Sequence, residues 1–599
     1  MMPGEKAKDF KGTMGKLIAY LHRYLPAIVM VLLFAVASTI FSIIGPKILG
    51  SATDELFNGI VAQITGTGSI DFGAVGRILA FLGVIYIVSS LLSYIQGFIM
   101  TRVSTEISYN MRKDISEKIN RMPLSYFDRV SHGEVLSRIT NDVDIVTQTL
   151  NQSMTQIVTS VTQFIGVLVM MLTISRLMTL VALCILPLSV LIVSNVVKRS
   201  QPYFKKQQAY LGKVNGHVEE MYGGHLVVTA FNGEQRSVDA FNELNDKLYE
   251  SAWKSQFFSG MMMPLMNFVS NLGYVGICIL GGFLSLHGRI TVGDIQAFIQ
   301  YVRSFTQPIQ QIANISNVLQ QTAAAAERVF AFLDEEEEDP DPENPLSPDL
   351  IQGSVLFAHV QFGYTPEKTI IHDFSAVVEP GQKVAIVGPT GAGKTTMVKL
   401  LMRFYDVSQG AILLDGYNVK QFARNELRDQ FGMVLQDTWL YNGSIMENIR
   451  YGRLEATDEE VIAAAKAAQV DHFVRTLPDG YNTVLNEEAS NISQGQKQLL
   501  TIARTILSNP KILIFDEATS SVDTRTEVSI QKAMDHLMEG RTSFIIAHRL
   551  STIRDADMIL VMKDGDIVET GRHEELLAKH GFYSELYQSQ FADSSDEAV

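Results

Sequence analysis

A glycine-rich loop in the second half of the chain is the strongest candidate for a functional site. The stretch from Gly388 to Thr396 reads G-P-T-G-A-G-K-T-T and follows the apolar run at 384–387. Glycines at this spacing let backbone N–H groups turn inward around phosphate oxygens, and a helix starting at Lys394 points its positive end at them. Lys394 would then reach the β- and γ-phosphates, and Thr395 would hold Mg²⁺. The alternative is a glycine-rich turn that happens to precede a helix.

Two acidic residues end a second apolar run. Asp516 and Glu517 follow K-I-L-I-F at 511–515, which has the composition of a buried strand. At the C-terminal edge of a strand, Asp516 suits an Mg²⁺-associated acid, and Glu517 suits a base that polarises an attacking water. A pair of acids at a strand end is weak evidence alone. With a phosphate loop roughly 120 residues upstream, the pair predicts nucleotide hydrolysis.

Composition separates the chain into two halves. Hydrophobic residues make up 47% and charged residues 19% of the 599 residues, and the charges lie mostly outside long apolar runs in the first half. This pattern is typical of a membrane half joined to a soluble half. The net charge is −15 and no basic block interleaves with aromatic residues, which argues against a nucleic-acid partner. Cys184 and Cys278 lie in apolar runs, so a disulfide framework or metal site is not expected.

Six apolar segments in the first half are long enough to cross about 30 Å of hydrocarbon. A break at Ser175-Arg176 divides the long run at 157–197 into two of them, joined by a tight hairpin. Thr291 and Asp294 form a capping box that begins the sixth. That last segment should face a wet cavity or partner helices, because lipid would not tolerate its polar stripe. The stripe consists of Gln296, Gln300, Arg303, Gln307, Gln310, Gln311 and Asn314.

Lysine and arginine placement predicts the orientation in the membrane. Residues 51–76 contain neither, whereas 101–150 and 198–257 are rich in both. Those two segments, and both termini, are therefore expected in the cytosol. Apolar residues repeat every three or four positions from Val103 to Met122, so the membrane helices should continue into the cytosol. The breaks near 123–127 and 229–233 fit either short helices at the tips of these extensions or simple interhelix turns.

The tract D-E-E-E-E-D-P-D-P-E at 334–343 is a self-repelling, proline-broken linker. From Ile351 the sequence alternates short β-rich runs with helical segments, as in an α/β domain. The predicted fold class is an α-helical six-span transmembrane domain fused to an α/β P-loop nucleotide-binding domain. We expect four parts: a cytosolic N-terminal segment (1–22), the transmembrane domain (23–325), the acidic linker (326–350) and the nucleotide-binding domain (351–599).

The order of these motifs resembles an ATP-binding cassette (ABC) exporter half-transporter over nearly the whole chain. The resemblance places Tyr364 against adenine and gives Gln436 an Mg²⁺-sensing role in the loop that touches the membrane domain. It places Asp523 in the D-loop and His548 on the γ-phosphate. The nucleotide site that it implies is Tyr364, Gly388, Pro389, Thr390, Gly391, Ala392, Gly393, Lys394, Thr395, Thr396, Gln436, Asp516 and Asp523, with Glu517 and His548 catalytic and Thr395, Gln436 and Asp516 on Mg²⁺.

One motif departs from the family pattern. Where the family has the signature L-S-G-G-Q, this chain has I-S-Q-G-Q, formed by Ile492, Ser493, Gln494, Gly495 and Gln496. Ser493 and Gln496 can still form a capping box for the helix that follows. Gln494 adds a Cβ and an amide where glycine lets the backbone approach the opposite subunit's γ-phosphate. The alternative is a tolerated variant with no consequence.

The resemblance implies ATP and Mg²⁺ as cofactors and a transporter of two subunits in a bacterial inner membrane. We expect a heterodimer whose second half-transporter supplies an intact signature, and an amphipathic or hydrophobic substrate of the multidrug type. A lipid flippase or peptide exporter, and an ATP-gated channel or sensor, stay open. Most of the following residues are expected in lipid-facing or packing positions, although they could line a cavity: Phe164, Met170, Met171, Met261, Met262, Met263, Met266 and Phe298.

Overall fold

The computed structural model describes residues 7–365, 367–435, 438–486, 491–516, 524–546 and 553–591. The chain divides into two compact units. The helical unit contains residues up to Asn120 and Ser131–Glu335, and the α/β unit contains Arg121–Val130 and everything from Glu336 on. Arg121–Val130, a segment from the first half of the chain, therefore folds with the C-terminal unit.

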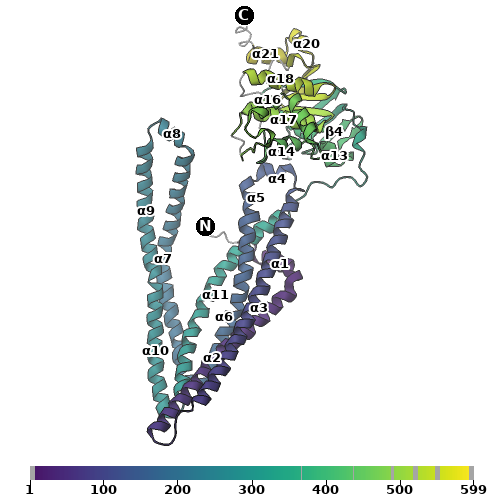
Figure 1. Ribbon diagram of the computed structural model, residues 1–599. Coiled ribbons are helices and arrows are strands. Elements are labelled where there is room, and N and C mark those ends of the chain that lie inside the picture. The colour runs from purple at the N-terminus through teal and green to yellow at the C-terminus, as the bar shows by residue number, and fades with distance from the viewer. Residues whose placement is uncertain are drawn as a thin grey trace. The chain divides into compact units, whose positions relative to one another are not determined.

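Long helices make up the helical unit. The structure has α1 (Phe10–Leu21), α2 (Leu25–Ile64), α3 (Phe72–Ile119), α5 (His132–Ser137), α6 (Val143–Ile174), α7 (Arg176–Gly223), α8 (His225–Ala230), α9 (Glu234–Gly260), α10 (Met262–Leu286) and α11 (Val292–Leu333) (Figure 1). Five helical stretches in the described residues are long and apolar enough to span a membrane, by length and composition. The sixth expected span, α11, is 42 residues long but is not among those five. The polar residues recurring along it account for the difference.

Local capping fixes where these helices begin. The Ser175 side chain accepts a hydrogen bond from the backbone of Met178 and separates α6 from α7, as the expected tight hairpin requires. Thr291 and Asp294 form the predicted capping box at the start of α11. At the tips, the structure has short helices rather than simple turns, namely α8 and α4 (Leu124–Arg129). α8 lies somewhat earlier in the chain than the break near 229–233.

The helical unit has its own packed core. Ile43, Met171, Phe298 and Tyr301 are among its fully or almost fully buried side chains. Phe164 stacks on Phe305 with ring centroids 4.8 Å apart. These positions are helix-packing ones, as expected for most of the methionine and phenylalanine set. Met263 is 65% exposed, which fits the other expected kind of position, one that faces lipid.

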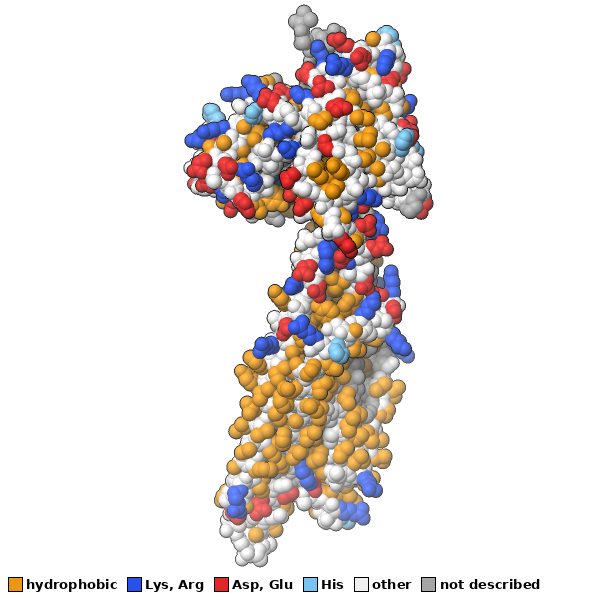
Figure 2. Space-filling model, turned by 90° about the vertical axis from the view of Figure 1, so that its right-hand side faces the viewer, with side chains coloured by type: hydrophobic (Ala, Val, Ile, Leu, Met, Phe, Trp, Pro, Cys, Tyr) orange, Lys and Arg blue, Asp and Glu red, His pale blue; other side chains and the backbone are white. Residues whose placement is uncertain are grey.

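Two glycines bring α2 and α11 into close contact. A Cβ on Gly293 would lie 1.9 Å from the backbone oxygen of Gly50, so neither position has room for a side chain. Asp54 accepts a hydrogen bond from the Gly293 N–H at 2.6 Å. Figure 2 shows a band of hydrophobic side chains over the helical unit, with charged side chains gathered at both ends of the band. A surface of this kind suits a lipid environment.

The α/β unit contains two sheets. The larger has the strand order β10-β9-β3-β8-β7-β6, and the smaller has the order β2-β1-β4-β5. In the larger sheet, β3, β6, β7, β8 and β9 are parallel and β10 is antiparallel at the edge. The strands are β1 (Val355–Phe362), β2 (Ile371–Val378), β3 (Lys383–Val387), β4 (Gln409–Leu414), β5 (Tyr417–Asn418), β6 (Phe431–Val434), β7 (Ile512–Asp516), β8 (Thr542–Ile546), β9 (Met558–Lys563) and β10 (Asp566–Gly571).

Helices cover the larger sheet, and both faces of its central strands are buried, as parallel sheets require. The four residues Val384 to Val387 of β3 are all at most 3% exposed. The helices of this unit are α12 (Lys394–Leu401), α13 (Arg424–Arg428), α14 (Ile445–Arg450), α15 (Asp458–Ala467), α16 (Asp471–Thr476), α17 (Gln494–Ser508), α18 (Thr524–Met538), α20 (His573–Ala578) and α21 (Phe582–Phe591).

The acidic tract after α11 forms ion pairs with arginines of the α/β unit. The buried guanidinium of Arg424 lies 3.5 Å from Glu338, 3.3 Å from Asp341 and 3.4 Å from Asp406. Arg428 also pairs with Glu338 at 3.5 Å. These cations offset the repulsion among the carboxylates, which the composition of the tract alone could not reveal.

Candidate nucleotide-binding site

The phosphate loop connects the buried strand β3 to the first residue of α12. Gly391 and Gly393 have φ angles of +86° and +99°, which residues with a Cβ rarely adopt. The loop therefore turns as the glycine spacing predicts. Lys394 opens α12 and is 8% exposed. Its Nζ donates to the backbone oxygens of Gly388 at 2.8 Å and Pro389 at 3.1 Å, so the ammonium lies across the loop.

The two threonines after Lys394 face different surroundings. Thr396 is buried, and its Oγ1 lies 3.2 Å from the hydroxyl of Tyr364. Thr395 is exposed at the start of α12, where a hydroxyl can reach a cation held by phosphates. The N–H groups of this first turn and the helix dipole both favour an anion.

Tyr364 packs beside the start of α12. Its ring lies edge to face with the ring of Tyr405, with centroids 5.2 Å apart, and the Nζ of Lys399 lies 5.7 Å from its centroid. Tyr364 is nevertheless 44% exposed. Its aromatic surface is accessible to a flat ligand, within the same unit as the phosphate loop.

Asp516 is the last residue of β7, and it pairs in parallel register with Ile546, the last residue of β8. β8 in turn pairs in parallel with β3. The carboxyl ends of these three strands therefore meet at one edge of the sheet, the edge at which the phosphate loop begins. Open α/β sheets bind ligands at this edge. The residues are described up to Asp516 and Ile546, and the predicted Gln436, Glu517, Asp523 and His548 lie outside the described residues.

The altered signature is well defined at the start of α17. The Ser493 side chain accepts from the backbone of Gln496, and the Gln496 side chain accepts from the backbone of Ser493, so the capping box is confirmed. Gly495 is buried. Gln494 is exposed, and its Nε2 donates to the hydroxyl of Thr438 at 3.3 Å. A glycine at this position would offer only backbone there.

One group of contacts near α12 could not be predicted from the sequence patterns. Tyr405 donates a hydrogen bond to Asp128 of α4, and the Nζ of Lys399 lies 3.7 Å from the same carboxylate. Burial, together with the Asp128 carboxylate, raises the pKa of Tyr405 above its ordinary value, so the hydroxyl stays protonated and donates. No spacing rule joins residues 277 positions apart.

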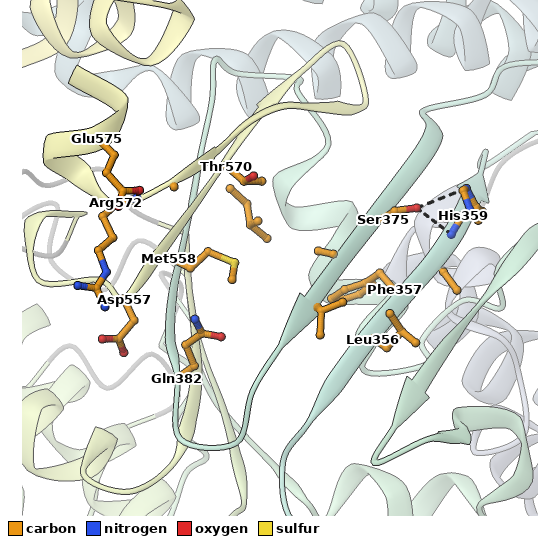
Figure 3. Close-up of a pocket in the computed structure, with 15 residues that line it drawn as sticks. Leu356, Phe357, His359, Ser375, Gln382, Asp557, Met558, Thr570, Arg572 and Glu575 are labelled. Carbon is orange, nitrogen blue, oxygen red and sulfur yellow. Dashed lines mark hydrogen bonds between the residues drawn. The ribbon is translucent and has the colours of Figure 1, made fainter. Parts of the chain in front are cut away.

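A separate cleft of about 740 Å³ lies between β1 and β2 on one side and β9 and β10 on the other (Figure 3). No residue of the phosphate loop lines it. Asp373 lies 2.9 Å and Ser375 3.5 Å from the same nitrogen, Nδ1, of the exposed His359. A proton relay needs the serine and the carboxylate on opposite ring nitrogens, so this group is no nucleophilic centre.

Comparison with known proteins matches each of the two units to a known family. The family model of the ABC transporter transmembrane region matches residues 28–309, and the family model of the ABC transporter matches residues 371–520. A fatty acid ABC transporter ATP-binding/permease protein of Mycobacterium tuberculosis is 46% identical, covering 98% of this chain and 97% of its own. An ATP-dependent lipid A-core flippase of Syntrophus aciditrophicus is 34% identical, covering 85% and 84%.

A solved structure agrees with these matches. A bacterial Atm1-family ABC exporter with ATP bound superposes with a TM-score of 0.72 at 28% identity, covering 96% of this chain and 99% of that one. Both the helical unit and the α/β unit have counterparts in it. The chain therefore belongs to the ABC transporters, as an exporter half-transporter that couples ATP hydrolysis to transport.

Proposed function

We propose that this chain is one half of an exporter that moves amphipathic, lipid-like compounds out of the inner leaflet of a bacterial inner membrane. The observation that carries this proposal is the similarity to a fatty acid transporter over 98% of the chain, joined to that with a lipid A-core flippase. Large apolar side chains on α3 support it, because Phe98 is 63% and Tyr94 71% exposed. A multidrug substrate would share this amphipathic chemistry.

For the nucleotide chemistry we propose the following roles for the predicted site residues. Lys394 and the backbone N–H groups of the loop would hold the phosphates, and the ring of Tyr364 would stack on the base. Thr395, Asp516 and Gln436 would hold Mg²⁺, which neutralises phosphate charge when bound. Glu517 would accept the proton of the attacking water, and His548 would contact the γ-phosphate.

The working transporter is proposed to be a heterodimer. ABC half-transporters close each ATP between one subunit's phosphate loop and the other's signature, and Gln494 alters the signature that this chain offers. A homodimer would pair an intact catalytic side with a poor signature at both sites. A partner with L-S-G-G-Q would complete the site formed by Lys394 and Glu517. The opposite site, closed by Gln494, would then hydrolyse slowly or not at all.

We place both termini and the α/β unit in the cytosol, because the segments rich in lysine and arginine lie on that side. ATP binding would close the two α/β units and hydrolysis would reopen them, driving the helices between two states.

Flux measurements in proteoliposomes test this function. The transporter, purified by a tag on this chain so that any partner is retained, should move a fluorescent lipid between leaflets only with hydrolysable ATP. Ion conductance without uphill flux would instead support a channel, and peptide flux without lipid flux would support a peptide exporter.

A further inference from the structure

A partly buried arginine, Arg504, lies on α17, the helix that begins at the altered signature. At about 1.5 Å per residue, it stands about 15 Å after Gln494 along the helix. Its Nε donates to the backbone oxygen of Asn448 at 2.9 Å, and one terminal nitrogen donates to the Asn448 side-chain oxygen at 3.2 Å. The other terminal nitrogen donates to the backbone oxygen of Trp439 at 3.2 Å. One planar guanidinium therefore joins α17 both to α14 and to the loop at 438–444 that precedes α14.

Asn448 extends this connection along the 438–444 loop. It is fully buried, and its Oδ1 accepts from the Tyr441 N–H at 3.1 Å as well as from Arg504. Its Nδ2 donates to the backbone oxygens of Tyr441 at 3.0 Å and Ser444 at 3.1 Å. Both acceptor positions and both donors of this amide are thus used, which fixes its orientation. The loop is held to α14 by Asn448, and to α17 by Arg504.

Aromatic rings surround the guanidinium. Its central carbon lies 5.3 Å from the ring centroid of Tyr451, and that ring lies 6.3 Å from the ring of Trp439 and 6.0 Å from the ring of Tyr441. A Cβ added to Gly452 would lie 2.2 Å from the Arg504 backbone oxygen, so the turn after α14 packs directly on α17. Burial lowers the pKa of Arg504 below its ordinary value, but an arginine stays protonated in proteins. A positive charge in such a place is costly unless its hydrogen bonds are kept.

The 438–444 loop is the segment that leads from Gln436, a residue proposed above to hold Mg²⁺, to α14. Its first residue, Thr438, accepts a hydrogen bond from the Gln494 side chain at 3.3 Å. Gln494 is exposed, so water competes for this bond. Arg504 makes charge-assisted bonds in a partly buried place, and it is therefore the stronger of the two connections between the loop and α17.

We propose that Arg504 is a positioning residue for ATP hydrolysis. It fastens the loop that follows Gln436 to the helix that carries the signature, so that these two parts of the α/β unit move together. In a dimer of half-transporters, Gln436 serves this chain's own ATP and the signature at Gln494 serves the opposite one. A displacement at either site then reaches the other through Arg504 and Asn448. The inference concerns the ATP step, so it goes beyond the proposed lipid export and does not depend on it.

Amide hydrogen exchange followed by mass spectrometry tests this inference on the transporter purified by a tag on this chain. Arg504→Gln removes the charge-assisted bonds, so exchange in the 438–444 loop should become about tenfold faster. Exchange in β3 and α12 should stay as in the wild type. Arg504→Lys keeps the charge and the aliphatic stem but not the planar fork, so it should show the same change more weakly. If Arg504→Gln fails to fold, Arg504→Lys takes its place in the test.

Steady-state kinetics gives a second measurement. In Arg504→Gln, kcat for ATP hydrolysis should fall by about tenfold and KM for ATP should stay the same. KM is retained because, in the described part of the chain, Arg504 has no contact with Lys394 or Tyr364. Arg541→Gln is the matched control. Arg541 is also a partly buried arginine of the α/β unit, and it donates to the side-chain oxygen of Asn509 at 2.8 Å. Its replacement should leave both kcat and the exchange of the 438–444 loop unchanged.

Three results would overturn the inference. The first is wild-type exchange of the 438–444 loop in both Arg504 variants. The second is faster exchange throughout the α/β unit, because Arg504 would then only stabilise the fold. The third is a kcat that falls equally in Arg504→Gln and Arg541→Gln, or that stays unchanged while KM rises. Lipid flux is not measured in this test, so failure of the proposed lipid export would leave the role of Arg504 standing.

Discussion

Tyr405 donates a hydrogen bond to Asp128, and through it α4 is held to the segment that follows α12. The same carboxylate lies 3.7 Å from the Nζ of Lys399, which stands five residues after Lys394 on α12. One short helix from the first half of the chain is thus tied to the helix that begins at the phosphate loop. A movement of that loop on nucleotide binding can therefore be transmitted to α4 through these two contacts.

Tyr405→Phe should weaken this connection. The change removes one hydrogen bond to a partly exposed carboxylate, a loss of about 1 kcal/mol and so about fivefold in any equilibrium that the bond supports. We expect substrate stimulation of ATPase activity to fall by up to that factor while basal activity is retained. Tyr417→Phe is the matched control, because no hydrogen bond of its hydroxyl is present among the described residues. Full stimulation in Tyr405→Phe would show that the bond carries no coupling.

Gly293→Ala should destabilise the helical unit. Its Cβ would lie 1.9 Å from the Gly50 backbone oxygen, so α2 and α11 must separate, at a cost of about 1–3 kcal/mol for overpacking. Thermal unfolding of the purified transporter in detergent measures the effect. Gly282→Ala is the control, because its added Cβ would meet nothing within 4 Å. Equal unfolding temperatures for the two variants would contradict the close packing.

Much of this fold could be predicted because its signals are local. The glycines of the phosphate loop, Ser175 between α6 and α7, and the capping box from Thr291 to Asp294 each act within a few residues, and the structure has them where the sequence indicates. The β-rich run at 383–387 is β3, and the run at 511–515 is β7 within one residue. Short-range hydrogen bonds and backbone limits decide such features before the chain folds.

Contacts between distant residues could not be predicted in the same way. Arg424 binds Asp341 across 83 positions, and Tyr405 binds Asp128 across 277, so no periodicity connects them. The sequence alone therefore predicts a self-repelling acidic tract, whereas in the structure Arg424 and Arg428 pair with Glu338. The polar stripe of α11 was expected to face a cavity or partner helices. In the structure the exposed side chain of Arg303 lies 5.9 Å from the ring centroid of Tyr274 on α10, a partner helix.

Glu517→Gln should preserve ATP binding and largely abolish hydrolysis. The amide can position a water but cannot accept its proton, and loss of a general base costs about 10²- to 10⁴-fold in rate. Lys394→Ala is the informative comparison, because it should instead weaken ATP affinity by about 10- to 100-fold through loss of a charge-assisted contact. Equilibrium binding and steady-state turnover of the purified transporter separate the two effects. Near wild-type turnover in Glu517→Gln would reject its role as the base.

The altered signature gives the last prediction, which concerns this chain purified without a partner. Such a homodimer has Lys394 and Glu517 at both sites but Gln494 opposite each, so its ATPase activity should be low. Gln494→Gly removes the Cβ and the amide and leaves the capping box of Ser493 and Gln496 intact. Closer approach of the backbone to the γ-phosphate should raise turnover, by about tenfold for one recovered contact of average strength.

Thr438→Ala tests whether Gln494 obstructs the site by its bulk or by the hydrogen bond that its amide makes to Thr438. It removes the hydroxyl that accepts from the Gln494 amide at 3.3 Å and leaves the Cβ of Gln494 in place. If the bulk near the backbone is the obstacle, Thr438→Ala stays slow and only Gln494→Gly recovers activity. The double variant Glu517→Gln/Gln494→Gly is the negative control, because it should lack ATP hydrolysis and so gives the background turnover of the assay. Turnover by the unaltered homodimer as fast as that of the transporter isolated with its partner would disprove the need for a second kind of subunit.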